Sequence, residues 1–323
     1  MRAYRTILVT GCPRSGTTPV GANLALAPGA RYLYEPFNPR HGLRAIARYY
    51  EVPGANGFSP ANFDSCVDAI RRLRLDLRPY HGSGERGWRR LVKRVVGSRA
   101  QVSYRLCRLD WTLRTVIWKD PIACFTSAAA VDRHDVPVLV TVRPAAAVAA
   151  SYKRMQWQPG LPAVLASLAQ VGIDFPELRL RYEHLADNPV IGSAVLWCVI
   201  YTTLLQWAET RPQIQFVSLQ ESIDRPAEVY RDVYQRLGLQ WTPRVERRLR
   251  AQYLRSRTRA GTDAHPLPRR AHVARRGLED VNTYGRRLLT QEEAAVVEDM
   301  TAELELRLSS ACRESRIQNS AMR

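Results

Sequence analysis

The chain has 323 residues, of which 46% are hydrophobic and 24% are charged. This composition is typical of a soluble globular protein and excludes a chain too polar to bury a full core. The formal net charge of +18 indicates a polyanionic partner. Its sign alone does not distinguish a nucleotide, an acidic glycan, a nucleic acid or a membrane surface.

Cysteine usage and the start of the chain indicate a reducing compartment. The six cysteines form no C-x-x-C pair and no histidines stand at zinc spacing, which predicts reduced, mostly buried thiols and no metal site. The first predicted strand begins too close to the N-terminus for a signal peptide. The uncharged stretch 190–208 contains polar residues such as Gln206, so we expect a buried helix rather than a transmembrane segment. These features predict a cytoplasmic protein.

A strand, a glycine-bounded turn and the start of a helix open the chain. Residues 6–10 are apolar, β-branched and uncharged, as in a strand buried in a parallel sheet. Gly11 and Gly16 bound the turn, and Thr17 and Thr18 can cap the helix that follows. The backbone N–H groups of such a turn, together with the positive end of the helix dipole, form a cradle for an anion.

The turn departs from two phosphate-binding motifs that it partly matches. The spacing of Gly11 and Gly16 is nearly that of the nucleoside triphosphatase P-loop, but Thr17 stands where that loop has its lysine. A cysteine phosphatase needs an arginine six residues after Cys12, and that position is Thr18. The turn carries its positive charge at Arg14 instead. It therefore predicts binding of a nucleotide's 5′ anion without the usual triphosphate–magnesium chemistry.

The run GCPRSGTT resembles the 5′-phosphosulfate loop of sulfotransferases that use 3′-phosphoadenosine 5′-phosphosulfate (PAPS), in which P-[KR]-S-G-T-T opens the sequence. The resemblance implies that five residues of this loop bind the donor: Arg14, Ser15, Gly16, Thr17 and Thr18.

An extended segment follows the first helix. Residues 32–39 contain two prolines, which favour a loop that holds Glu35 beside apolar side chains. A solvated glutamate in a surface turn is the simpler interpretation of the composition. Carbohydrate sulfotransferases carry a Glu-Pro at this point, and the resemblance implies that Glu35 is the catalytic base.

Residues 42–114 are rich in arginine and predict a variable insertion that shapes the acceptor site. They include a formal G-x-G-x-x-G at 82–87 with Asp110 downstream. The residues before it are a poor buried strand, so a flexible surface loop is favoured over a dinucleotide-binding turn.

A second strand ends in charge at 116–121, where α/β sheets bind their ligands. An ordinary strand end with a solvated Lys119-Asp120 pair is the alternative interpretation. The segment resembles the sulfotransferase strand that delivers a lysine to the oxygen bridging phosphate and sulfate, which implies that role for Lys119. The histidine that serves as base in cytosolic small-molecule sulfotransferases is replaced by Pro121, so Asp120 is a second candidate base after Glu35.

A third strand, 137–142, leads into Arg143 and a helix predicted at 145–155. Ser151 lies two helical turns on, so Arg143 and Ser151 can face one ligand. The pattern is similar to the R-[DN]-P…S site that binds the 3′-phosphate in PAPS sulfotransferases. The residue between arginine and proline is absent here, so the local turn can differ.

The last third of the chain predicts a strand at 214–219, a helix at 226–237 capped by Gly238, and a final amphipathic helix at about 291–308. The tyrosine that sulfotransferases carry at the end of this strand is missing, which leaves the adenine contacts open. Residues 244–276 contain eleven arginines, and we expect a basic lid at about 244–286. The lid is either a solvated loop or a cover over PAPS, with Arg276 and Gly277 resembling a late 3′-phosphate contact.

Together these segments predict one domain over residues 1–323. The expected fold is α/β, a three-layer, doubly wound and mainly parallel sheet with helices on both faces. The resemblance implies a PAPS-dependent sulfotransferase that acts without a metal on a hydroxyl of a carbohydrate or natural product.

Two other functions remain as alternatives. A P-loop-type nucleotide kinase would need magnesium and ATP, and Thr17 counts against it. A nucleic-acid-binding protein predicts aromatic residues interleaved with the basic run, and between 244 and 276 only Tyr253 qualifies. We therefore expect no nucleic-acid partner.

Overall fold

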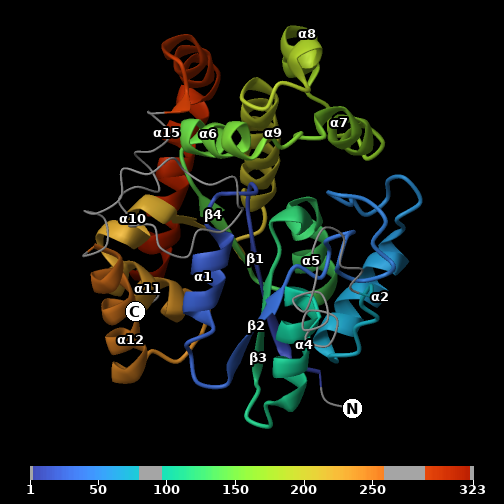
Figure 1. Ribbon diagram of the computed structural model, residues 1–323. Helices are drawn as coiled ribbons and strands as arrows, with labels where there is room; N and C mark the ends of the chain where they lie inside the picture. Colours follow the sequence, from blue (N-terminus) through green and yellow to red (C-terminus); the bar gives the residue numbers. More distant parts are fainter. Residues whose placement is uncertain (1–2, 80–96, 258–287, 321–323) are drawn as a thin grey trace, which may run out of the picture.

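The computed structural model describes residues 3–79, 97–257 and 288–320. At its centre lies a sheet of five parallel strands in the order β2-β3-β1-β4-β5 (Figure 1). The strands are β1 (Arg5–Thr10), β2 (Ala30–Tyr34), β3 (Thr115–Lys119), β4 (Val138–Val142) and β5 (Ile214–Ser218).

The inner strands form because their sequences are continuous apolar or β-branched runs, which suit a sheet covered on both faces. All five residues of β3 are buried, and so are all residues of β1 after Arg5. In the register of the sheet, Val9 and Tyr34 both pair with Lys119. The carboxyl ends of β1, β2 and β3 therefore lie side by side.

One face of the sheet is covered by helices that border the glycine turn. These are α1 (Thr17–Leu24), α10 (Leu219–Asp224), α11 (Pro226–Arg236) and α12 (Pro243–Arg257) (Figure 1). Their apolar side chains pack with one face of β1, β3 and β4 in a compact core. The hydroxyl of Tyr253 accepts a hydrogen bond from Asn23 at 3.2 Å, which ties α12 to α1.

The other face and the sheet edges carry the larger core. Its main helices are α2 (Pro60–Arg71), α4 (Arg99–Leu109), α5 (Ser127–His134), α6 (Ala145–Met155), α9 (Ile191–Ala208) and α15 (Gln291–Ser320). Smaller elements are η1 (Pro121–Thr126), α7 (Leu161–Ala169), α8 (Pro176–Tyr182) and η2 (Glu183–Leu185). Helix α9 is long and apolar enough to cross a membrane, and 72% of it is buried inside the protein.

The fold class predicted from the sequence is confirmed by the parallel sheet and its helices on both faces. Three local expectations were wrong. Residues 32–34, expected to begin a loop over 32–39, belong to the edge strand β2. The expected lid begins with an ordered helix, α12, because Val245, Leu249 and Tyr253 recur at helical spacing and are buried.

The final helix also runs further than expected, to Ser320; its Val297, Leu304 and Leu308 are buried in the core, while Leu306 is 71% exposed. The glycine motif at 82–87 and the rest of the lid lie outside the described residues. All six cysteines are free and buried, as expected.

Candidate active site

The parallel topology brings the predicted site residues to one edge of the sheet. Glu35 follows β2, Lys119 ends β3, and Arg143 follows β4. The glycine turn at 11–16 follows β1, which lies between β3 and β4. Segments far apart in the sequence therefore meet around the turn, with the carboxylate and lysine on one side and Arg143 on the other.

The turn itself is built for close approach. Gly16 has a φ of 96° and serves as the N-cap of α1, a conformation that a side chain rarely adopts. A Cβ there would meet Leu219 at 2.6 Å. Within the described residues no side chain caps α1, and its first turn has no acidic residue. The first N–H groups of α1 and the positive end of its dipole are therefore available to bind an anion.

The hydroxyl residues of the turn differ in what they do. Thr17 and Thr18, expected as caps, are instead the first residues of α1. Ser15 is fully buried, and its Oγ lies 2.7 Å from Oγ1 of Thr141 on β4. Ser15 therefore anchors the turn to the sheet, and Thr17 and Thr18 stand at the uncapped end of α1.

Arg14 joins the turn to the predicted 3′-phosphate pair. Its Nε donates to Oγ of Ser151 at 2.8 Å. Nη1 of Arg143 donates to the backbone oxygen of Arg14 at 3.0 Å. Arg143 and Ser151 are both almost fully buried. The guanidinium group of Arg14 also lies over the ring of Trp157, with 5.7 Å from Cζ to the ring centroid.

Helix α15 holds the start of α6, and with it the Arg143 turn. Pro144 is the N-cap of α6 and offers no side-chain hydrogen bond. Oε1 of Glu305, on α15, accepts from the backbone N–H of Ala145 at 2.8 Å. The carboxylate that caps this helix thus comes from α15, while the sequence lacks the Asp or Asn between Arg143 and Pro144. A second bond, Lys153 Nζ to Glu293 at 2.6 Å, fixes the far end of α6 to α15.

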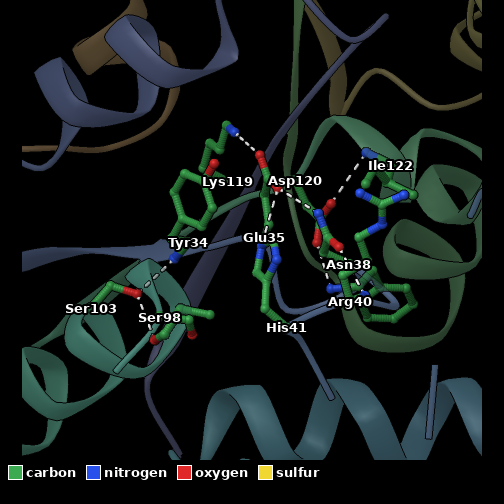
Figure 2. Close-up of polar contacts among 12 residues, drawn as sticks. Tyr34, Glu35, Asn38, Arg40, His41, Ser98, Ser103, Lys119, Asp120 and Ile122 are labelled. Atoms are coloured by element: carbon green, nitrogen blue, oxygen red, sulfur yellow. Dashed lines mark hydrogen bonds and ion pairs between the residues drawn. The ribbon is translucent and has the colours of Figure 1, made fainter. Parts of the chain in front are cut away.

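On the other side of the turn, Glu35 and Lys119 form a buried ion pair (Figure 2). Glu35 is 8% exposed and Lys119 is 2% exposed. The ammonium group of Lys119 donates to Oε1 of Glu35 and lies 4.6 Å from the centroid of the Tyr34 ring. Gly21 on α1 makes room for this lysine, because a Cβ there would come within 3.2 Å of the lysine Cβ.

Two further groups hold the second oxygen of Glu35. Nδ2 of Asn38 donates to Oε2 at 2.8 Å, and Nε2 of His41 lies 3.6 Å from the same oxygen. Burial alone would raise the pKa of Glu35, but His41, Lys119 and Asn38 favour the charged form and lower the pKa to about 2. Glu35 is therefore ionised at neutral pH.

Asp120 lies beside this pair but is oriented into the protein. It is fully buried, and its carboxylate accepts from the backbone N–H groups of Phe37 at 2.6 Å and Ile122 at 3.1 Å. Burial and the negative charge of Glu35 raise the pKa of Asp120 to about 7. These two hydrogen bonds attach the loop that contains Glu35 to the end of β3, so Asp120 holds that loop in place.

The structure thus brings together Arg14, Ser15, Gly16, Thr17, Thr18, Arg143, Ser151, Glu35, Lys119 and Asp120 at one sheet edge. Arg276 and Gly277 lie outside the described residues. Sequence reasoning missed Asn38, His41 and Glu305. The first two follow Glu35 closely without forming a known motif, and Glu305 is one of several acids on a long helix, so no sequence signal marked them.

Comparisons with known proteins find similar solved structures. One is the sulfotransferase domain from the curacin biosynthetic pathway, with a TM-score of 0.45, 13% sequence identity, and coverage of 94% of this chain and 99% of that chain. Another is the sulfotransferase STF9 from Mycobacterium avium, with a TM-score of 0.43, 16% identity, and coverage of 94% of this chain and 76% of that chain. No protein-family model and no curated protein matches the sequence.

Proposed function

We propose that this protein is a PAPS-dependent sulfotransferase that sulfates a hydroxyl of a carbohydrate or natural product. The observation that supports it most is the junction of Arg14, Ser151 and Arg143. An adenosine nucleotide with phosphates at both the 5′ and 3′ positions needs two anion sites a short distance apart. The hydrogen bonds of Arg14 to Ser151 and of Arg143 to Arg14 join the glycine turn to the Arg143–Ser151 pair, which supports two anion sites close together.

The residues present fit such a donor. The uncapped N-terminus of α1 suits its 5′ anion, and a Cβ at Gly16 would disturb that cradle. The fork of Arg143 and the hydroxyl of Ser151 suit a phosphate on the ribose, since a guanidinium group donates to two oxygens at once. The donor would supply the sulfuryl group, and the charge that builds on its leaving phosphate needs a nearby cation.

Lys119 and Glu35 would have the two remaining chemical roles, at the leaving group and at the acceptor. Lys119 would stabilise the leaving phosphate oxygen, and Glu35 would take the proton of the acceptor hydroxyl at a carboxylate oxygen. While paired with Lys119, Glu35 is ionised but a weak base, because its pKa is held at about 2. A shift of the ammonium group toward the phosphate would remove a partner of Glu35 and raise its pKa, making it a better base once the donor is bound.

Ligand preference tests the proposal. Thermal unfolding of the full chain would be followed with adenosine 3′,5′-bisphosphate, ATP with magnesium, and an oligonucleotide, since a ligand of the folded state raises the melting temperature by mass action. We expect the bisphosphate to raise it most and Arg143→Ala to remove that effect. A response to ATP–magnesium with none to the bisphosphate would overturn the proposal in favour of a kinase. A response to the oligonucleotide alone would favour nucleic-acid binding.

The acceptor needs a separate experiment. Sulfur-labelled PAPS and a panel of sugars and hydroxylated natural products would be incubated with the wild-type protein and with Glu35→Gln. We expect label transfer by the wild type only. Equal transfer by Glu35→Gln would exclude Glu35 as the base.

A further inference from the structure

Three large apolar side chains at the end of α4 are exposed to solvent. Trp111 is 92% exposed, Leu109 is 78% exposed and Leu106 is 56% exposed. Among the described residues, eight large hydrophobic side chains are exposed, and three of the eight lie within residues 106–111. Single exposed apolar residues need no explanation, but three so close together in the sequence point to an interaction site.

The fold explains why these side chains are not part of the core. Helix α4 lies along the edge strand β2 (Figure 1). Its buried residues are Ala100, Ser103 and Cys107. Leu106 and Leu109 are three residues apart, so they neighbour each other on the helix surface. Tyr104 is partly buried against the core as well, but Leu106 and Leu109 are exposed, so burial within the fold does not account for these two leucines.

Positive charge surrounds the exposed apolar group. Arg105, Arg108 and Arg114 are exposed. Asp110 is the one acidic residue in the sequence from 99 to 114, and it is paired with Arg31. The surface formed by Arg105, Leu106, Arg108, Leu109 and Trp111, here called the α4 patch, therefore combines apolar tips with a positive rim.

We propose that the α4 patch attaches the protein peripherally to an anionic lipid surface. Tryptophan is favoured at the boundary between headgroups and acyl chains, leucine enters the acyl region, and arginine binds anionic headgroups. A nucleic acid would use the arginines and the indole ring but would gain nothing from two exposed leucines. The chemistry of the patch therefore favours lipid.

The placement of the patch keeps the proposed active site open. Trp111 lies four residues before Thr115, the first residue of β3, whereas Lys119 ends that strand. The patch is therefore at the amino end of the sheet, opposite the carboxyl edge where Glu35 and the glycine turn lie. Lipid binding and nucleotide binding should be independent, which gives the test an internal control.

Sedimentation of the full-length protein with vesicles tests this proposal. Vesicles of phosphatidylcholine alone would be compared with an equal mixture of phosphatidylcholine and phosphatidylglycerol, at low and high salt. We expect binding to the mixed vesicles that weakens with salt. Removing the charge of Arg105 or Arg108 should weaken it about fivefold each, and Leu109→Ser with Trp111→Ser should abolish it.

Matched variants elsewhere separate the patch from general effects. Leu180→Ser with Leu306→Ser removes apolar side chains that are 89% and 71% exposed. Arg247→Glu with Arg248→Glu reverses exposed charges on α12, to be compared with Arg105→Glu with Arg108→Glu. We expect both control pairs to bind vesicles with less loss than the patch variants. All variants should keep the wild-type melting temperature, and the patch variants should also keep the bisphosphate response.

Several results would overturn the lipid proposal. They are equal binding to neutral vesicles, no binding to either kind, and equal losses in patch and control variants. A shift from dimer to monomer in analytical ultracentrifugation caused by the patch variants, without vesicle binding, would assign the patch to a second copy of the chain. Failure of the bisphosphate response in every variant and in the wild type would instead count against the proposed enzymatic function.

Discussion

Arg14 and Ser151 are 137 residues apart in sequence and 2.8 Å apart in the structure, measured from Nε to Oγ. This bond makes the glycine turn and the first turns of α6 parts of one surface. Hydrogen bonds to charged groups contribute about 1.5–3 kcal/mol, which corresponds to a factor of roughly 10 to 150 in affinity. Arg14→Ala and Ser151→Ala should each weaken adenosine 3′,5′-bisphosphate binding within that range, measured by calorimetry.

The two losses should also be less than additive in the double variant, because both remove the same contact. Arg133→Ala and Ser65→Ala serve as controls, since both residues lie on the surface away from the sheet edge. Fully additive losses would show that Arg14 and Ser151 contact the ligand independently.

The buried pair of Glu35 and Lys119 predicts an asymmetric stability effect. Lys119→Met leaves a carboxylate that is 8% exposed without its cation, which costs about 3–5 kcal/mol of unfolding free energy. Lys119→Met with Glu35→Gln should cost clearly less than Lys119→Met alone. Urea unfolding at neutral pH measures the unfolding free energy of the single and the double variant. If the double variant is the less stable of the two, the pair is stabilised by something other than mutual charge.

Low pH should remove the contribution that the same pair makes to stability. The pKa of Glu35 falls from 4.5 in the unfolded chain to about 2 in the fold. Its contribution to stability is therefore complete above pH 4.5 and is lost as the pH falls toward 2.

Asp120 predicts the opposite trend at higher pH. Its pKa rises from 3.8 to about 7 on folding, because it is buried next to Glu35. The unfolded chain loses this proton above pH 3.8 while the folded chain keeps it, so stability should decline between pH 3.8 and 7. Asp120→Asn should flatten that decline in urea unfolding measured across the range. Asp187→Asn, at an exposed position, should leave the profile unchanged.

Glu305 should affect nucleotide binding from outside the site. It accepts a hydrogen bond from Ala145 and so holds the start of α6 beside Arg143. Loss of such a helix cap costs about 1 kcal/mol, so Glu305→Ala should weaken bisphosphate binding by about fivefold. Glu305→Gln keeps an acceptor oxygen and should restore most of the affinity.

A steady-state assay separates these roles further. Glu305→Ala should raise the KM for the donor with little change in kcat. A fall in kcat with an unchanged KM would contradict a positioning role for Glu305.

The parts of the fold that could be predicted from sequence were those with local signals. Strands β1, β3 and β4 are mainly apolar or β-branched runs, β5 has its apolar residues at Ile214, Phe216 and Val217, and the glycine turn has a recognisable spacing. Strand β2 was missed because only Ala30 and Leu33 are fully buried at this edge, and the prolines that follow suggested a loop. The pairing of Lys119 with Glu35 and the reach of Glu305 to Ala145 depend on tertiary contacts across 84 and 160 residues, which no local pattern encodes.

The cap that α15 gives to α6 has a consequence for how the protein is made. During synthesis the glycine turn leaves the ribosome first, and Arg143 and Ser151 follow. Glu305 emerges later still, after β5 and α12 have been translated. Because domains fold from their N-terminal parts onward during synthesis, the glycine turn can form early, while the start of α6 beside Arg143, the proposed ribose-phosphate site, is held in place last. A nascent chain stalled before α15 should therefore be compact around its sheet and still bind adenosine 3′,5′-bisphosphate poorly.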